Sequence, residues 1–220
     1  LIQVQNLPQN HIKDLNVARK VVKTGDLELL EMLYDNPSDI LSQCIRPAII
    51  PAPGYKFAVA DFSAIEARII AWFAGESWRL DVFQSHGKIY EASAAQMFRV
   101  PIESIKKGDP LRQKGKIAEL ALGYQGAKGA LVSMGALKMG LDEDELPGLV
   151  KQWRAANSKI VQFWYTTEAA VIDAIENRSA VKITNNLKAI YKSGMLFLEL
   201  PSGRRLAYVK PRVTDHPKFP

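Results

Sequence analysis

The sequence has few of the residues from which disulfides and transition-metal sites are built. Its 220 residues include one cysteine, Cys44, and three histidines. A single cysteine excludes an internal disulfide and a cysteine-rich zinc site, and it fits a reducing cytoplasm. His11 and His86 have no partners at ligand spacing, so we interpret both as surface or packing residues. No apolar run approaches the roughly 20 residues of a membrane helix, and no signal peptide is visible.

The chain does carry an excess of positive charge. Its 29 Lys and Arg residues against 23 Asp and Glu residues give a formal net charge of +6, with a pI near 9.3. This balance suits a phosphate-rich partner but does not demand one. Because the chain opens on Leu1 without a methionine and stops in the proline-rich segment 213–220, we expect it to be a fragment of a longer protein.

The first quarter of the chain predicts helices followed by an extended segment. Residues 11–46 indicate two or three short helices, and the prolines and glycine of 47–54 then favour an extended connection. Lys56–Asp61 is a short apolar run that is typical of a buried strand.

The rest of the chain indicates a long helical stretch that ends in strands. Helix signals begin at Ser63 and dominate residues 76–177. Residues 195–200 and 204–209, joined by a Pro-Ser-Gly turn, predict a β-hairpin. A strand and helix, a helical excursion and further strands together predict a mostly helical α+β fold with an inserted helical lobe.

One predicted helix carries cations at the end where folding stability favours acids. Asp109 and Pro110 predict its start as N-cap and first helical residue. Arg112, Lys114 and Lys116 then occupy the first two turns, where the helix dipole and the free N–H groups already create a positive field. A polyanion such as a triphosphate would be held by this cluster, and a solvated basic face is the alternative.

An acidic residue stands where the predicted strand meets the next helix. Mg²⁺ prefers one or two carboxylates together with substrate oxygens, so Asp61 is a candidate ligand, with the carbonyl of Phe62 beside it. The alternative is that Asp61 is a turn residue at the end of a strand. Ser63 and Glu66 have the spacing of a capping box, and Arg68 has three possible roles: pairing with an acid, contacting a phosphate or facing solvent. The following apolar residues are predicted to face the core: Ile65, Ile69, Ile70, Trp72 and Phe73.

Two motifs, taken in order, resemble DNA polymerase family A, the polymerase I-like enzymes, and in particular its bacteriophage-type branch. Asp61-Phe-Ser-Ala-Ile-Glu-Ala-Arg68 resembles the family's Asp-Tyr-Ser-Gln-Ile-Glu-Leu-Arg motif. Arg112-x3-Lys116-x3-Leu120-x3-Tyr124 resembles the pattern Arg-x3-Lys-x3-Phe/Tyr-x3-Tyr-Gly of the family's fingers helix. Residues 5–8 and 87–95 also match, so the resemblance covers almost the whole chain.

The resemblance implies a right-hand polymerase fold with antiparallel palm strands and an inserted helical fingers lobe. Residues 1–75 would be part of the palm with the first catalytic motif. Residues 76–194 would be the fingers, and 195–220 would be a β-hairpin with the start of a truncated return to the palm.

The resemblance also implies roles for single residues in nucleotide binding. Arg112 and Lys116 would grip the triphosphate, and Glu66 would be the steric gate that crowds a ribose 2′-hydroxyl. Tyr124 would pack near the template base and hydrogen-bond Glu66, and Leu120 would replace the aromatic residue beside the sugar. Tyr90 would lie where the family often has a histidine near the phosphates. Helix geometry agrees, because a spacing of four residues advances about 400° and ~6 Å per step and gives a stripe of ~18 Å.

The remaining implied sites concern metal and DNA. Asp61 would be one of two metal-binding carboxylates, with the Phe62 carbonyl on the same Mg²⁺. The residues implied to contact DNA are Gln5, Asn6, Arg68, Arg204 and Arg205.

The implied activity is DNA-templated DNA synthesis from dNTPs on a primer–template by two-metal catalysis, in the cytoplasm of a bacterial host or phage-infected cell. The second carboxylate, which the family takes from a downstream His-Asp-Glu segment, is missing: Asp215-His216 has the reverse order, and the acidic run 142–145 is predicted to begin a helix. We therefore expect this chain to be inactive alone. The alternatives are a non-catalytic module that binds DNA or nucleotide, and a relative of the single-subunit RNA polymerases, against which Glu66 argues.

Overall fold

The computed structural model describes residues 6–214, and the chain forms two compact units, Leu1–Asp61 and Phe62–Pro220. The first unit contains three short helices, as the sequence predicts for 11–46: α1 (Leu15–Thr24), α2 (Leu27–Leu33) and α3 (Pro37–Gln43), followed by the 3₁₀ turn Arg46–Ala48. Each helix begins where a side-chain oxygen of Asp14, Asp26 or Asn36 accepts a hydrogen bond from a free backbone N–H. A small core that includes Ala18, Val21, Leu30 and Ile40 holds them together.

The predicted strand at Lys56–Asp61 is wrong for the described chain. Residues 56–61 have no regular secondary structure and are all exposed, Val59 at 92%. An apolar run predicts burial only if another element covers it, and a strand forms only beside a partner. The sequence of residues 56–61 alone shows neither which element would cover this segment nor which strand would pair with it.

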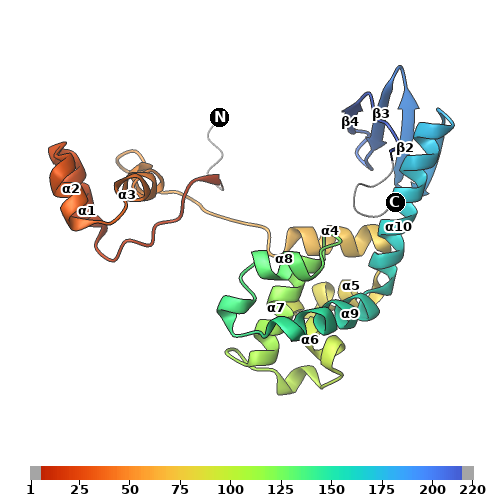
Figure 1. The fold of residues 1–220 in the computed structure, drawn as a ribbon, viewed down its shortest axis with the longest axis horizontal. Helices are drawn as coiled ribbons and strands as arrows, with labels where there is room; N and C mark the ends of the chain where they lie inside the picture. The colour runs from red at the N-terminus through yellow and green to blue at the C-terminus, as the bar shows by residue number, and fades with distance from the viewer. Residues whose placement is uncertain (1–5, 215–220) are drawn as a thin grey trace. The chain divides into compact units, whose positions relative to one another are not determined.

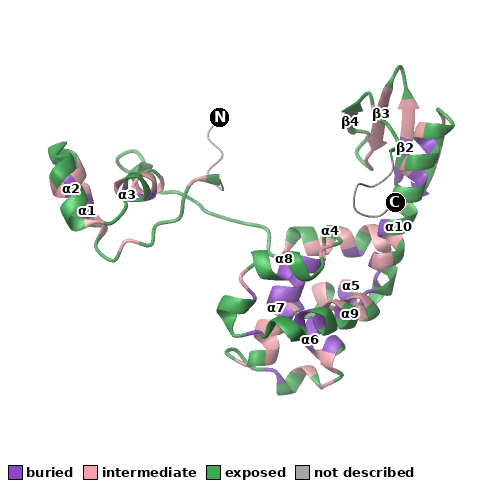
Figure 2. Cartoon of the chain, viewed as in Figure 1, coloured by how far each residue is buried: buried purple, intermediate pink, exposed green. Residues whose placement is uncertain are grey.

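The second unit begins with a group of helices (Figure 1). Their bounds are α4 (Ile65–Ala74), α5 (Ser77–Ser85), α6 (Ile89–Phe98), α7 (Pro110–Leu122), α8 (Lys128–Ser133), α9 (Leu146–Ala156) and α10 (Ser158–Glu176), with 3₁₀ turns at Ile102–Ser104, Leu137–Met139 and Glu143–Glu145. Buried residues gather where α6, α7 and α9 meet (Figure 2). Trp153 is fully buried, Trp164 nearly so, and their rings stack at 5.8 Å, so both belong to the core.

Helices α6 and α7 pack closely because Gly115 has no side chain. A Cβ at this position would overlap the backbone carbonyl oxygen of Tyr90 and press on Ala94. The close approach fixes the register between α6 and α7, and therefore the place of every functional side chain on α7 relative to Tyr90.

Helix α4 only partly follows its predicted pattern. Ile70 and Phe73 pack against buried residues of the second unit, as expected. Ile65, Ile69 and Trp72 were predicted to face the core but are 36%, 44% and 48% exposed. They lie on one helical face at spacings of four and three residues, and the prediction that this face is buried in the core is wrong, because periodicity does not show whether another element covers the face.

Helix α10 connects the helical group to an antiparallel sheet. Ile160 and Trp164 in its first half belong to the helical core, whereas Ala170 and Ala174 in its second half pack on the sheet. The strands β1 (Ala180–Thr184), β2 (Leu187–Lys192), β3 (Met195–Glu199) and β4 (Arg205–Val209) pair in the order β1-β2-β3-β4.

The hairpin of β3 and β4 confirms the prediction for 195–209. Strands β1 and β2 fall within 76–194, the range assigned to the helical lobe, so its helices end with α10. Val181, Ile183, Leu187 and Ala189 alternate with polar residues and face α10, a period-two pattern that fits strands. Among the described residues, no helix is both long and apolar enough to cross a membrane.

Candidate functional site

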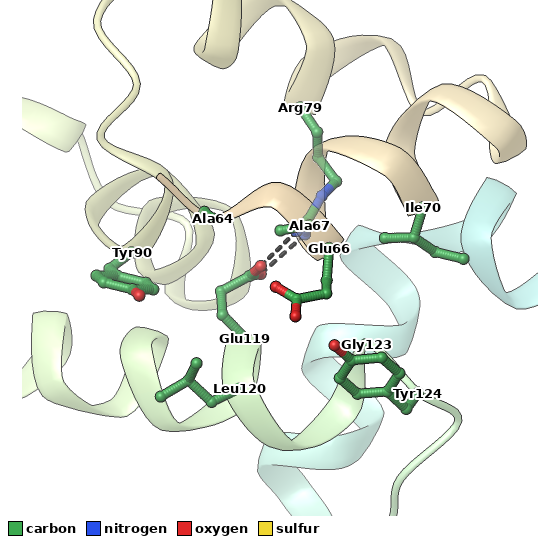
Figure 3. Close-up of a pocket in the computed structure, with 10 residues that line it drawn as sticks. All are labelled: Ala64, Glu66, Ala67, Ile70, Arg79, Tyr90, Glu119, Leu120, Gly123 and Tyr124. Carbon is green, nitrogen blue, oxygen red and sulfur yellow. Dashed lines mark hydrogen bonds and ion pairs between the residues drawn. The ribbon is translucent and has the colours of Figure 1, made fainter. Parts of the chain in front are cut away.

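The sequence motifs meet at a pocket between α4 and α7 (Figure 3). The pocket is open to solvent on one side and holds about 590 Å³ of space when that open mouth is included. It is lined by Ala64, Glu66, Ala67, Ile70, Arg79, Tyr90, Glu119, Leu120, Gly123 and Tyr124. Four of the predicted nucleotide-binding residues therefore line the same pocket: Glu66, Tyr90, Leu120 and Tyr124.

The chain enters α4 through a left-handed residue and not through a capping box. Ala64 is the N-cap with φ 51°, and no side chain caps the helix, so the prediction of a Ser63–Glu66 box is wrong. The left-handed turn lets the helix begin at Ile65 and leaves the Glu66 carboxylate without a capping role. Glu66 then lines the pocket from the first turn of α4.

Glu66 and Tyr124 approach each other across the pocket. The Glu66 carboxylate points toward the Tyr124 ring in Figure 3. Burial raises the pKa of the Tyr124 hydroxyl, and the negative charge of Glu66 raises it further. The hydroxyl therefore stays protonated at neutral pH, but the described structure has no hydrogen bond between it and Glu66.

Arg112 is held beside the pocket by α6. Its Nε donates to the Glu91 carboxylate at 2.6 Å, and its guanidinium lies 5.6 Å from the centre of the Tyr90 ring. Burial raises the pKa of Glu91, but the hydrogen bond and charge of Arg112 outweigh burial, so that the pKa is lowered overall. Arg112 thus has a fixed position, and its charge already has an internal partner in Glu91.

The two lysines of the same helix differ in their surroundings. Lys114 forms an ion pair with Glu145, 2.9 Å from Nζ to Oε1. Lys116 is half-buried and has no hydrogen bond or ion pair to any residue that the structure describes. It lies one turn before Leu120, on the stripe that leads into the pocket. Lys116 is therefore the cation of this helix that is available to an anionic ligand.

A buried network that forms part of the pocket lining was missed by the sequence analysis. Arg79 on α5 pairs with both carboxylate oxygens of Glu119 on α7, and its Nη1 also donates to Asn157 at 2.9 Å. Trp153 Nε1 donates to Glu119 at 3.0 Å. The Arg79 and Glu119 side chains are only 1% and 3% exposed. The available signal was an acid inside the apolar run 117–122, since a buried acid requires a buried cation.

The residues expected to bind metal, Asp61 and Phe62, do not belong to a cluster of metal ligands among the described residues. Asp61 ends the first unit and Phe62 begins the second, and both are exposed. The described residues contain no group of three or more His, Cys, Asp and Glu side chains placed to hold a metal ion. The acidic run 142–145 directly precedes α9, as predicted, and Glu143 and Glu145 pair with lysines.

The residues expected to contact DNA have varied surroundings. The Nε of Arg68 donates to the Ser63 carbonyl, and its guanidinium lies 4.4 Å from the Phe83 ring centre, so it braces the start of α4. Arg204 is exposed beside a turn, and Arg205 on β4 pairs with Glu199. Asn6 is exposed in the first unit; Gln5, like Asp215 and His216, lies outside the described residues.

Comparison with known proteins decides the family. Residues 35–191, which include both motifs, match the family model for DNA polymerase family A. The chain belongs to DNA polymerase family A. Over 219 residues this family A chain is 64% identical to a DNA polymerase of Bacillus phage SP02, covering 100% of the chain and 34% of the phage protein.

Bacterial members of the family are more distant. DNA polymerase I of Pseudomonas aeruginosa is 30% identical over 57% of the chain and 13% of its own length. The thermostable DNA polymerase I of Thermus aquaticus is 36% identical over 34% of the chain and 8% of its own length. This family A chain thus spans about a third, or less, of the length of the relatives it matches.

Proposed function

We propose that this chain is the nucleotide-binding part of a DNA-templated DNA polymerase, with residues 76–194 as the fingers and residues 1–75 and 195–220 as parts of the palm. The observation that carries the proposal is the shared pocket of Glu66, Tyr90, Leu120 and Tyr124, with the unpaired Lys116 one turn away. The order along α7, from cations to apolar and aromatic groups, follows the order of a nucleotide from triphosphate to base.

Each residue then has a distinct role in binding a dNTP. Lys116 neutralises the phosphate oxygens together with Arg112, whose position is fixed by Glu91. Leu120 provides an apolar contact beside the sugar. Glu66, oriented toward Tyr124, occupies the space that a ribose 2′-hydroxyl would need. This steric role favours a DNA polymerase over the related RNA polymerases.

Mg²⁺ fits the described residues only in part. Asp61 offers a carboxylate and Phe62 a carbonyl oxygen, which are ligand types that Mg²⁺ prefers. Two-metal phosphoryl transfer needs a second carboxylate that can reach both ions, and no acidic cluster in the described chain supplies it. Bound metal would neutralise the charge that develops on the phosphates. We therefore assign Asp61 as one ligand and expect that the 220 residues alone do not extend a primer.

Primer extension by the complete protein tests the proposal. We expect template-directed incorporation of dNTPs, abolished by Asp61→Asn and retained by the control Asp35→Asn, since Asp35 is an exposed acid in the first unit. Incorporation that survives Asp61→Asn would overturn the role of Asp61. Binding of DNA without any synthesis by the complete protein would favour the non-catalytic module instead.

A further inference from the structure

The positive charge of the chain is concentrated in the sheet and in the segments that flank and connect its strands. Residues 178–214 contain eight Lys and Arg residues and a single acid, Glu199, a net charge of +7. The whole chain has a net charge of +6, so the rest of the sequence is close to neutral, at −1. All eight cations are exposed: Arg178, Lys182, Lys188, Lys192, Arg204, Arg205, Lys210 and Arg212.

The strand register places a row of these cations across one face of the sheet. Lys182 is opposite Lys188, Lys188 is opposite Glu199, and Glu199 is opposite Arg205. Because side chains alternate along a strand, this row lies on the face away from α10, whereas Ala189 and Leu196 face the helix and are buried. Lys192 lies four residues after Lys188 on the same strand, so its side chain is on the same outer face.

Internal pairing leaves most of this charge uncompensated. Glu199 accepts from Arg205 at 2.6 Å and lies 3.7 Å from Lys188, which uses the only acid of the sheet. The other six cations form no ion pair within the described chain. Like charges directly opposite on neighbouring strands are destabilising, so the Lys182–Lys188 pair works against folding. An external anion would remove that penalty.

We propose that the outer face of the β1–β4 sheet binds the sugar–phosphate backbone of duplex DNA without reading its sequence. The proposal rests on the proposed function for the identity of the polyanion. Lysine and arginine contacts to phosphate position a protein on DNA and carry no base specificity. Single-stranded DNA is bound by stacking on exposed aromatic rings, and the outer face offers one aromatic ring, Phe197, which is half-buried beneath Arg205.

The salt dependence of DNA binding by the complete protein tests the surface. The sheet variant carries Lys182→Gln, Lys188→Gln and Lys192→Gln, the three lysines of the outer face. The control variant removes the same charge from exposed lysines outside the sheet, with Lys107→Gln, Lys138→Gln and Lys151→Gln. Fluorescence anisotropy with a labelled primer–template, between about 50 and 200 mM salt, gives log Kd against log salt concentration.

Each phosphate contact contributes about 0.9 to the slope, so three lost contacts should lower its magnitude by about 2.7 in the sheet variant. We expect affinity for the duplex to fall at least about tenfold at the lowest salt, with the control slope unchanged. The KM for dNTP at saturating DNA should stay the same in both variants. Thermal midpoints of the two variants, compared with the parent, verify that neither loses its fold.

Equal slopes in the sheet and control variants would overturn the proposal, as would a loss of affinity confined to single-stranded DNA. Neither result touches the nucleotide pocket, which Lys116→Ala tests separately through dNTP affinity. A sheet variant that bound duplex DNA normally but no longer bound an acidic protein would assign the face to a protein partner instead.

Discussion

Replacing Arg79 by methionine should destabilise the second unit more than any surface substitution. The guanidinium is 1% exposed and bonds Glu119 and Asn157. Without it, the Glu119 carboxylate stays buried with a single neutral donor, Trp153. Removing one partner of a buried ion pair costs about 3–5 kcal/mol, because it leaves an uncompensated charge in a medium of low polarity. That is a large share of the 5–15 kcal/mol that stabilises a typical domain.

Urea denaturation followed by tryptophan fluorescence measures this cost. All four tryptophans lie at 72, 78, 153 and 164, so the signal reports the second unit alone. Arg79→Met should lower the free energy of unfolding by about 3–5 kcal/mol. Arg212→Met, which removes an exposed arginine, should stay within about 0.5 kcal/mol of the parent.

The double variant separates charge from packing. Glu119→Gln keeps an acceptor for Trp153 but removes the charge, so Arg79→Met with Glu119→Gln should be more stable than Arg79→Met alone. The reasoning is refuted if Arg79→Met costs less than about 1 kcal/mol. It is also refuted if adding Glu119→Gln lowers stability further.

Three more predictions follow from single contacts. Gly115→Ala should lower the thermal midpoint, because its Cβ overlaps a backbone oxygen of α6, whereas Gly129→Ala meets nothing within 4 Å and should not; equal midpoints would contradict the close packing. Glu66→Ala should raise ribonucleotide incorporation by the complete protein, and unchanged selectivity would count against the steric role. Because the pKa of Glu91 is lowered, its pair with Arg112 stabilises the fold at pH values above the ordinary pKa of 4.5, and this stabilisation is lost as the pH falls below that value. Glu91→Gln should therefore remove this part of the pH dependence of the free energy of unfolding. Unfolding curves measured between pH 3 and 6 check this.

Local signals predicted α7 and the last hairpin correctly. The Asp109 side chain accepts from the Leu111 N–H at 2.7 Å, and Pro110 is the first helical residue, as the sequence indicates. The β3–β4 hairpin forms around its Pro-Ser-Gly turn. In both cases the information lies within a few residues, where capping and turn chemistry act.

Long-range partners were not predictable in the same way. The run at 56–61 has the composition of a strand, yet it has no neighbour in the described chain. The Arg79–Glu119 pair joins residues 40 apart, and periodicity gives no sign of which cation meets which acid. The left-handed Ala64 also replaced a cap whose residues were present at the correct spacing.

In the site, the spacing of four residues places Leu120 and Tyr124 in the same pocket as Glu66. The sequence could not show which of the three cations of α7 is free to bind a ligand, because the acids that pair with the other two lie outside α7. Glu91 compensates Arg112, Glu145 compensates Lys114, and Lys116 is left available.

The affinity of the complete protein for Mg–dNTP on a primer–template, measured for Lys116→Ala and Lys114→Ala, tests the central claim most directly. The variants remove the same charge from the same helix, two residues apart. A charge-assisted hydrogen bond is worth about 1.5–3 kcal/mol, so Lys116→Ala should raise the Kd by about tenfold or more. Lys114→Ala, whose lysine is engaged by Glu145, should leave the Kd within about twofold of the parent. Equal effects of the two substitutions, or a larger effect of Lys114→Ala, would contradict the assignment of the pocket as the nucleotide site.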